Sequence, residues 1–287
     1  MTLFQLVKIT LDSLYAEAKA LHGSKTDKRI NEAIALLSAS YGQLANNARA
    51  PISYKDAVTR FAYVFKYVAA HGDYIIQLLE AYRNISGGKI FGLEKMRLTC
   101  IGGGPGSDLL AIIKYLLENE SEGVKKVTCY LIDGEQAWAD TWTELDDAFN
   151  SNFRLSTNFQ KLDVTNPTSW ADQRKFLEAD VFTVSYFVSE VMSLDHSGTV
   201  TNFWDTVFSS ARSGALFFYT DNGSTVFDSY FDKLWKKHKL KRVYGYENQR
   251  VIPRFSEQTS DLGNYARKFN HNPKVQAFAS ARVLKKP

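Results

Sequence analysis

The pattern of apolar and polar positions divides the chain into two parts. Before residue 95 the apolar positions recur at helical spacing, most clearly over 31–44 and 53–82. Ser86 and the two glycines that follow it end the second of these helical patterns. From residue 95 onward, short apolar runs alternate with amphipathic segments. We therefore expect an N-terminal helical domain at 1–94, acting as a lid or in substrate recognition, and a second domain at 95–287.

The second domain is expected to have an α/β fold. The apolar runs predict strands at 97–101, 127–132, 158–162, 180–186, 214–219, 242–246 and 276–284. The amphipathic segments predict helices at 107–118, 136–149, 167–177, 197–211 and 224–237. Such alternation is typical of a largely parallel sheet with helices on both faces.

A glycine-rich turn follows the first predicted strand. Gly102, Gly104 and Gly106 stand between the apolar run that ends at Ile101 and the amphipathic segment that begins near Ser107. Glycine tolerates positive φ and lets a ligand lie against the backbone, because it has no Cβ. The helix that follows offers free N–H groups and the positive end of its dipole. The turn therefore predicts a site for a nucleotide-like cofactor.

Acidic residues stand at the ends of the next two predicted strands. Asp133 ends the second strand, where a carboxylate can accept hydrogen bonds from both hydroxyls of a ribose. Asp163 ends the third strand, where it can meet the edge of an adenine ring. Three such features at three successive strand ends point to one adenosyl-containing ligand.

The spacing of the glycines separates two cofactor families. The dinucleotide pattern G-x-G-x-x-G needs a glycine or alanine at 107, but the chain has Ser107, and Pro105 lies within the turn. The pattern G-x-G-x-G instead resembles that of class I S-adenosylmethionine-dependent methyltransferases, over roughly residues 95–285. The resemblance implies a Rossmann-like fold with a mostly parallel seven-stranded sheet. It also implies S-adenosylmethionine as cofactor and S-adenosylhomocysteine as product.

The same resemblance assigns roles to individual residues. The three glycines would lie under the methionine moiety, Asp133 would hold the ribose, and Asp163 would bond the adenine amino group. The further cofactor-binding candidates are Asp108, Val164 and Ser185. The chain departs from the family pattern at Cys100, where an acid is common, and at Gly134, where an apolar residue usually packs on the adenine. Trp138 or Val164 can take over that packing.

The acceptor of the methyl group should meet the ends of the fourth and fifth strands, because clefts in open α/β sheets lie there. These ends carry Tyr186 and Glu190 after the fourth strand and Asp221 after the fifth. We expect Tyr186 and Glu190 to act as base or to position the acceptor, and Asp221 is a further candidate. Each also has a structural interpretation, in loop solvation or core packing.

One face of the predicted helix at 53–82 is unusually polar. Arg60, Tyr63, Tyr67, His71 and Tyr74 recur at spacings of three and four residues and therefore share that face. They form either a packed aromatic seam between the domains or a lid over the cofactor. In the second interpretation Tyr67 and His71 are catalytic candidates, because histidine can act as a base near neutral pH.

Composition narrows the protein class. The chain has 287 residues, of which 45% are hydrophobic and 23% charged, as in ordinary globular proteins. It has no apolar run of about 18 residues that could span a membrane, and its start lacks the pattern of a secretory signal. Cys100 and Cys129 fall in predicted strands and are expected to be buried thiols, and no cluster has zinc spacing. We expect a cytoplasmic protein that binds neither a metal nor a membrane.

Positive charge is concentrated near the end of the chain. Residues 233–287 hold fourteen Lys or Arg against three Asp or Glu, a net charge of +11. Interleaved aromatic residues could stack on the bases of an RNA whose phosphates bind the cations, although such a run is more often a solvated face. Two base-modifying chemistries are excluded: no cysteine follows the fourth strand, and Ser185-Tyr186-Phe187-Val188 stands where an Asp/Asn-Pro-Pro-aromatic signature would be needed.

The sequence thus predicts a methyltransferase that acts on an oxygen or nitrogen atom. A small or medium-sized metabolite is favoured as acceptor, because a helical lid over an aromatic pocket suits an enclosed ligand. Two alternatives stay open. One is an RNA methyltransferase that uses the basic C-terminal segment, and the other is a non-catalytic protein that binds S-adenosylmethionine and has a regulatory role.

Overall fold

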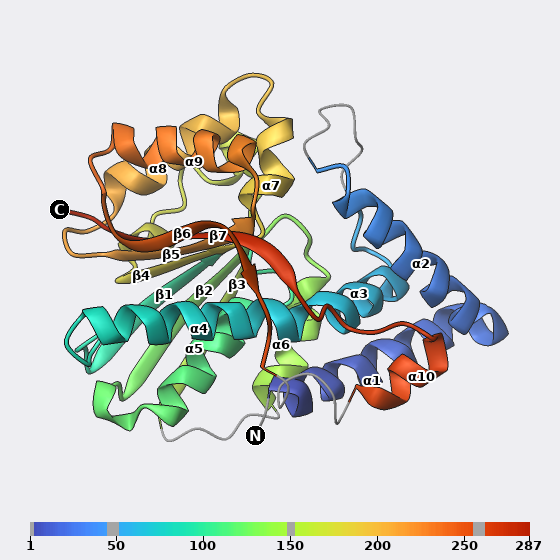
Figure 1. Ribbon diagram of the computed structural model, residues 1–287. Helices are drawn as coiled ribbons and strands as arrows, with labels where there is room; N and C mark the ends of the chain where they lie inside the picture. Colours follow the sequence, from blue (N-terminus) through green and yellow to red (C-terminus); the bar gives the residue numbers. More distant parts are fainter. Residues whose placement is uncertain (1–2, 45–51, 148–152, 255–261) are drawn as a thin grey trace.

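A seven-stranded sheet forms the centre of the protein (Figure 1). The computed structural model describes residues 3–44, 52–147, 153–254 and 262–287. The strands lie in the order β3-β2-β1-β4-β5-β7-β6, and all neighbours are parallel except those that pair with β7. They comprise β1 (Lys95–Ile101), β2 (Lys126–Asp133), β3 (Arg154–Lys161), β4 (Val181–Ser185), β5 (Leu216–Asn222), β6 (Lys241–Val251) and β7 (Ala277–Lys285).

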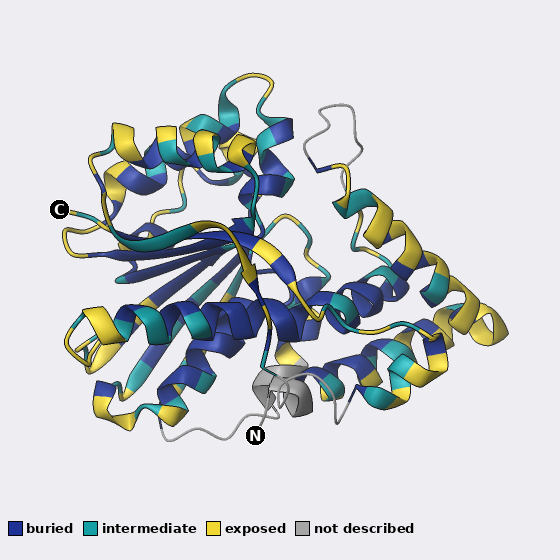
Figure 2. Cartoon of the chain, in the orientation of Figure 1, coloured by how far each residue is buried: buried dark blue, intermediate teal, exposed yellow. Residues whose placement is uncertain are grey.

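Helices cover both faces of the sheet. In Figure 1, α4, α5 and α6 lie on one face and α7, α8 and α9 on the other. Their bounds are α4 Ala69–Ile85, α5 Ser107–Glu118, α6 Trp138–Asp147, α7 Val188–Val191, α8 Thr199–Ser210 and α9 Thr225–Lys237. The central strands are therefore shielded from water on both sides, as the burial colours of Figure 2 show. This arrangement confirms the predicted fold class.

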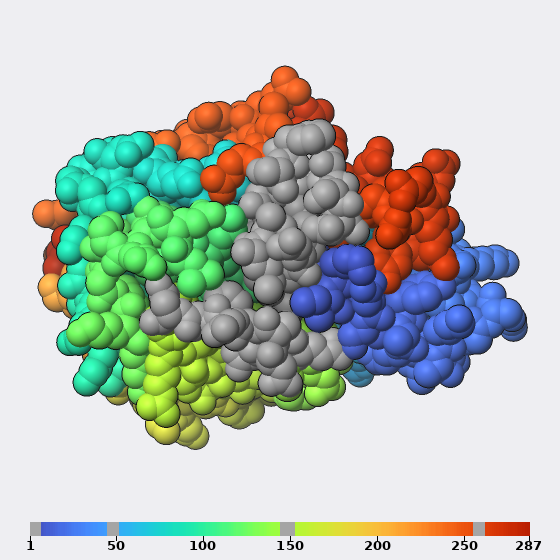
Figure 3. All heavy atoms as spheres, turned by 90° about the horizontal axis from the view of Figure 1, so that it is seen from below, coloured from blue at the N-terminus to red at the C-terminus, as the bar shows by residue number. Residues whose placement is uncertain are grey.

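The remaining helices extend beyond the carboxyl ends of the parallel strands (Figure 1). They comprise α1 (Leu3–His22), α2 (Thr26–Tyr41), α3 (Ala57–Tyr63) and α10 (Gly263–Phe269). Seen from below in Figure 3, the first helices and the segment that contains α10 lie side by side. The Tyr265 hydroxyl donates to Asp12 Oδ1 at 2.6 Å, and Lys268 pairs with Asp27. Segments from both parts of the sequence thus build this region.

One long helical rod connects the extension to the sheet. It begins at Asp56, whose side chain accepts from the Val58 N–H and so caps α3. It continues through η2 (Val64–Val68), one turn with π-helical hydrogen bonding, into α4. The rod therefore starts and ends three to four residues later than the predicted segment 53–82.

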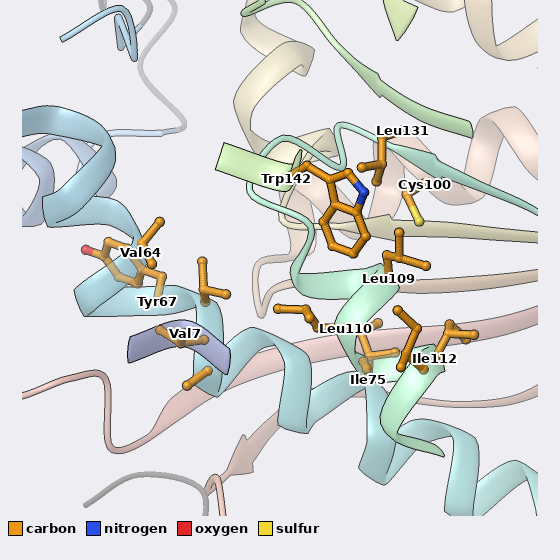
Figure 4. Packing of buried hydrophobic residues seen from close by; sticks show 14 of the residues in the cluster. Val7, Val64, Tyr67, Ile75, Cys100, Leu109, Leu110, Ile112, Leu131 and Trp142 are labelled. Carbon is orange, nitrogen blue, oxygen red and sulfur yellow. The ribbon is translucent and has the colours of Figure 1, made fainter. Parts of the chain in front are cut away.

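A single hydrophobic cluster runs from the extension to the sheet (Figure 4). It includes Val7 of α1, Val64 of the π-helical turn, Ile75 of α4, Leu110 of α5 and Leu131 of β2. Because the apolar core is continuous, the N-terminal helices are held by burial of apolar surface and not by a few polar contacts. The proposed domain boundary at residue 94 stays a prediction.

The structure corrects one predicted helix and adds two. The segment 167–177 forms two short 3-10 turns, η4 (Pro167–Ser169) and η5 (Lys175–Glu178). The side chain of Asn166 accepts from the Thr168 N–H and caps the first of them. The short helices α7 and α10 were not predicted, since neither is long enough to show a period. No helix among the described residues is long and apolar enough to cross a membrane.

Candidate functional site

Two cavities lie beyond the carboxyl ends of the parallel strands. The first cavity, of about 280 Å³, is lined by residues that include Tyr54, Tyr63, Gly102, Asp133, Trp138, Ser185, Tyr186 and Glu190. The second cavity, of about 380 Å³, is lined by residues that include Ser38, Tyr41, Tyr67, His71, Tyr186, Asn222 and Lys274. Tyr186 lines both and is therefore a wall that the two cavities share.

Asp133 is positioned in the first cavity by the end of β2. Its Oδ2 accepts from the Gly104 N–H at 3.0 Å, and its Oδ1 accepts from the Glu135 N–H at 2.9 Å. Burial raises the pKa of this carboxyl to about 6, although the two N–H donors oppose the shift. A carboxylate oxygen that accepts one hydrogen bond can still accept another. Asp133 is therefore fixed in place with acceptor capacity left for a ligand.

The glycine turn packs tightly against side chains of the site. Gly102 has a φ of +68°, and a Cβ there would lie 2.2 Å from the ring of Phe187. A Cβ on Gly104 would lie 2.8 Å from Asp133 Oδ2. Gly106 begins α5 in the left-handed conformation, under the ring of Trp142. Of these three glycines only Gly102 lines the first cavity, while the other two allow the turn and its neighbours to approach each other.

A chain of tyrosines and a glutamate closes the first cavity on the side of the extension. The Tyr41 hydroxyl donates to Glu190 Oε1 at 2.7 Å, and it lies 3.1 Å from the Tyr54 hydroxyl. The ring of Tyr54 lies 5.3 Å from that of Trp138, which begins α6. Burial and the nearby Glu190 charge raise the pKa of Tyr41 well above its usual value. These contacts join α2 and the residues before α3 to α7.

Asp108 and Ser185 lie where α5 meets the end of β4. Asp108 is in the first turn of α5 and is 1% exposed. Burial raises its pKa to about 6, and hydroxyl groups that include Thr183 and Ser185 oppose the shift. Ser185 lines the first cavity, whereas Asp108 lies behind it. Asp108 can therefore act on a ligand only through its neighbours.

Tyr186 and His71 stack face to face between the cavities. Their ring centroids lie 3.7 Å apart with an angle of 8° between the planes. Tyr186 is held with a φ of +53°, a conformation that is unfavourable for a bulky residue and is often found at functional sites. His71 is buried, its Nε2 has no hydrogen-bond partner among the described residues, and burial holds its pKa well below the usual value. His71 is therefore neutral near pH 7.

Lys274 enters the second cavity from the segment between α10 and β7. Its Nζ lies 4.8 Å from the ring centre of Tyr186 and 5.6 Å from that of Tyr67. Both distances fall in the range of cation–π interactions. Burial lowers the pKa of Lys274 to about 8, with Asp221 opposing the shift. The sequence analysis did not identify Lys274, because nothing local distinguishes it from the other basic residues near it.

The sequence comparison identifies the family. The profile of a family described as "Putative SAM-dependent methyltransferase" matches residues 47–222, which is more than half of the chain. The chain belongs to this family. It is therefore an enzyme, a methyltransferase that uses S-adenosylmethionine. No curated protein matches its sequence significantly.

Several solved structures resemble this methyltransferase in fold to different degrees. The carbon methyltransferase CurJ is 10% identical, with a TM-score of 0.51 over 94% of this chain and 70% of that one. A class I S-adenosylmethionine-dependent methyltransferase from Listeria monocytogenes is 14% identical, with a TM-score of 0.45 over 98% and 88% of the two chains. An O-methyltransferase family protein from Burkholderia thailandensis is 9% identical, with a TM-score of 0.45 over 92% and 73%. Only the likeness to CurJ has a TM-score above 0.5, and at 10% identity it concerns the fold alone.

Besides Gly104, Gly106 and Asp108, five residues singled out from the sequence are not among those that line the two cavities of this methyltransferase: Arg60, Tyr74, Asp163, Val164 and Asp221. Asp163 is exposed, and its Oδ1 accepts from both the backbone and the hydroxyl of Thr165. Val164 is buried in the hydrophobic cluster on the other side of the sheet. Arg60 donates to both carboxylate oxygens of Glu17 at 2.8 Å, so it turns toward α1. The polar helix face therefore contributes Tyr63, Tyr67 and His71 to the cavities, but neither Arg60 nor Tyr74.

The structure also adds residues that the sequence analysis did not single out. Besides Lys274, these are Tyr41 and Tyr54, which come from α2 and from the residues before α3. Nothing in their local sequence indicates a site. They reach it because the extension folds over the ends of the strands.

Proposed function

We propose that the first cavity binds S-adenosylmethionine. The buried carboxylate of Asp133 can accept from the ribose hydroxyls, and the backbone of Gly102 offers a surface without a side chain. The ring of Trp138 is 2% exposed and lies at the same wall, so it is the better candidate to pack on the adenine than Val164. These groups fit an adenosyl compound: a paired acceptor, an open stretch of main chain and an aromatic face.

The cofactor, when bound, supplies a methyl group on a sulfonium sulfur and leaves as S-adenosylhomocysteine. The side chains of this protein have to align the acceptor with that methyl group and to exclude water. Ser185 and Tyr186, at the end of β4, lie where they can both align the acceptor and exclude water. The Tyr41–Glu190 hydrogen bond closes the cavity above them.

We propose that the second cavity binds the acceptor, so that the N-terminal helices take part in substrate recognition. The observation that supports this most is the position of Tyr186, which lines both cavities. A ligand in the second cavity would meet one in the first at this side chain. Methyl transfer requires such contact, because the reacting atoms must approach to about 3–3.5 Å.

His71 is the best candidate to accept a proton from the acceptor. It is neutral because burial lowers its pKa, so one ring nitrogen can accept. Its Nε2 is buried and lacks a partner among the described residues, and the residue is part of the wall of the second cavity. Tyr67 lies against it with ring centroids 5.5 Å apart and would orient both the imidazole and the acceptor. Glu190 is engaged by Tyr41, which favours a role in positioning over one as a base.

The acceptor proposed for this site is a small or medium-sized metabolite with an oxygen or nitrogen nucleophile. The second cavity is lined by the aromatic rings of Tyr41, Tyr67, His71 and Tyr186, so a planar molecule fits it best. The positive charge of residues 233–287 is partly neutralised within the chain, which reduces the charge available to a polyanion. The following six cations pair with carboxylates of the chain itself: Lys236, Lys237, Arg242, Arg254, Lys268 and Arg282.

Methylation of RNA is the second candidate function. It is favoured by the net charge of +11 in residues 233–287. In that case a base turned out of the strand would occupy the aromatic cavity, and the basic segment would hold phosphates.

Transfer of labelled methyl groups to a cell extract tests both candidates. We expect label in the small-molecule fraction, with the same yield after treatment of the extract with nuclease. Label that appears in RNA and disappears after nuclease treatment would instead support RNA as the acceptor. Absence of any transfer, with S-adenosylmethionine bound in calorimetry, would mean that the extract holds neither of the two proposed kinds of acceptor.

A further inference from the structure

A buried carboxyl group lies at the end of β5, behind the second cavity. Asp221 is fully buried and is not among the residues that line either cavity. Its Oδ2 accepts from the Ser189 N–H at 2.9 Å, and its Oδ1 accepts from the Asn222 N–H at 2.7 Å. The Ser189 hydroxyl also donates to this carboxyl. Burial of a carboxyl is unfavourable unless it is well hydrogen-bonded, so this network has a defined geometry.

The network fixes the orientation of the Asn222 side chain. The Nδ2 of Asn222 lies 3.2 Å from Ser189 Oγ and 3.4 Å from Asp221 Oδ1. Because the Ser189 hydroxyl gives its hydrogen to Asp221, its oxygen can only accept from Asn222. The reverse orientation of the amide would also set its oxygen against a carboxylate oxygen. The nitrogen of the Asn222 amide therefore faces the network.

The amide oxygen of Asn222 is left for the second cavity. Asn222 lines this cavity, whereas Ser189 and Asp221 do not. The oxygen and the nitrogen point in different directions from the same carbon atom, so the oxygen is turned away from the network. Among the described residues it has no hydrogen-bond donor. The Tyr186 N–H donates to the Thr220 carbonyl at 2.8 Å, so the end of β5 lies beside the wall that the two cavities share.

We propose that Asn222 determines the specificity for the acceptor: its Oδ1 accepts a hydrogen bond from an N–H or O–H group at the edge of a planar acceptor. This inference rests on the proposed function, since it places the acceptor in the second cavity. A molecule without such a donor would leave the amide oxygen without a partner in a partly buried site, which is unfavourable. Sites that bind a polar group in this way reject analogues that lack it. Asp221 and Ser189 are positioning residues, because they act through the orientation of the amide.

The binding of indole and benzofuran tests the role of Asn222. The two probes have the same shape, but only indole has an N–H donor, and neither ionises near neutral pH. The protein is loaded with S-adenosylhomocysteine, and ligand-observed NMR titration gives the dissociation constant of each probe. We expect the wild type to bind indole at least about fivefold more tightly than benzofuran, which corresponds to one net hydrogen bond. Asn222→Leu and Asn222→Ala should bind both probes equally, and Asn202→Leu, at an exposed position on α8, should keep the wild-type ratio.

Asp221→Asn tests the positioning role. It replaces a carboxylate oxygen by a group that can donate, so the Asn222 amide can turn and present its N–H to the cavity. The preference for indole should then disappear. A purely structural role of Asp221 would instead weaken both probes alike and leave their ratio unchanged.

The outcomes separate this proposal from the one it rests on. The proposal is wrong if Asn222→Leu or Asn222→Ala unfolds at the same temperature as the wild type and keeps the preference for indole. It is also wrong if the wild type binds the two probes equally, or binds neither, while it binds S-adenosylhomocysteine and transfers methyl groups. An unchanged ratio in Asp221→Asn would overturn the positioning role. Failure of the wild type to bind S-adenosylhomocysteine would instead overturn the proposed function.

Discussion

Replacement of Asp133 tests the cofactor site most directly. Its carboxylate is fixed by the N–H groups of Gly104 and Glu135, and in the proposed complex it accepts from the ribose hydroxyls. A hydrogen bond to a charged group contributes about 1.5–3 kcal/mol. Loss of one such bond should therefore weaken binding about 10- to 150-fold.

Titration calorimetry with S-adenosylhomocysteine measures this loss. Asp133→Asn is the better variant, because it keeps the size of the side chain and one acceptor oxygen. Asp133→Ala would also leave two N–H groups without their partner and could destabilise the fold. Asp163→Asn is the matched control, since Asp163 is exposed and its carboxylate already accepts a hydrogen bond from the Thr165 N–H. It should change the affinity by less than about twofold, because its change in free energy should be a few tenths of a kcal/mol.

The pH dependence provides a second measurement on the same variant. Burial raises the pKa of Asp133 to about 6, so the carboxyl gains a proton as the pH falls through that value. The neutral form is a weaker acceptor, and the affinity of the wild type for S-adenosylhomocysteine should fall below about pH 6. Asp133→Asn has no such group and should show a flatter profile. Wild-type affinity and an unchanged pH profile in Asp133→Asn would refute the assignment of Asp133.

Three further predictions concern packing, protonation and closure. Gly102→Ala should lower the free energy of unfolding by about 2–4 kcal/mol, because the φ of Gly102 is positive and a Cβ there would meet Phe187. Urea unfolding measures this loss. The control is Gly123→Ala, which should lose only about 1 kcal/mol, because Gly123 has a positive φ but open space around it. A histidine with a lowered pKa binds fewer protons in the folded than in the unfolded state, so the wild type should lose stability as the pH falls below about 6.5. His71→Gln should therefore show a smaller fall in melting temperature between about pH 7.5 and pH 5.5 than the wild type. An equal fall in both proteins would contradict this. Tyr41→Phe removes the hydrogen bond to Glu190. It should weaken the binding of S-adenosylhomocysteine, measured by calorimetry, about fivefold, the equivalent of about 1 kcal/mol. An unchanged affinity would mean that this contact does not close the site.

The sequence predicted those parts of the fold that depend on local patterns. The strands that end at Ile101 and Asp133 were identified, because a buried parallel strand is a short apolar run and its end is marked by a turn. The position of Tyr67 and His71 on one helix face follows from helical periodicity alone. The structure places both at the second cavity.

Other features depend on contacts between distant segments, which no local pattern reveals. Arg60 shares the periodicity of its neighbours, but the carboxylate of Glu17 turns it toward α1. The Lys274 N–H reaches the carbonyl of Lys66, some two hundred positions earlier in the chain. Tyr41 contacts Glu190, which lies 149 positions later. The π-helical turn changes only the hydrogen-bond register of the rod, and apolar spacing does not report that change.

The π-helical turn also constrains how this region can vary among related proteins. Removing one residue between Val64 and Val68 would restore ordinary helical hydrogen bonding and rotate everything before it by about 100°. The Lys66 carbonyl would then be turned away from the segment before β7, and the hydrogen bond that it accepts from the Lys274 N–H would be lost. A natural homologue that lacks this residue should therefore also differ in the segment between α10 and β7.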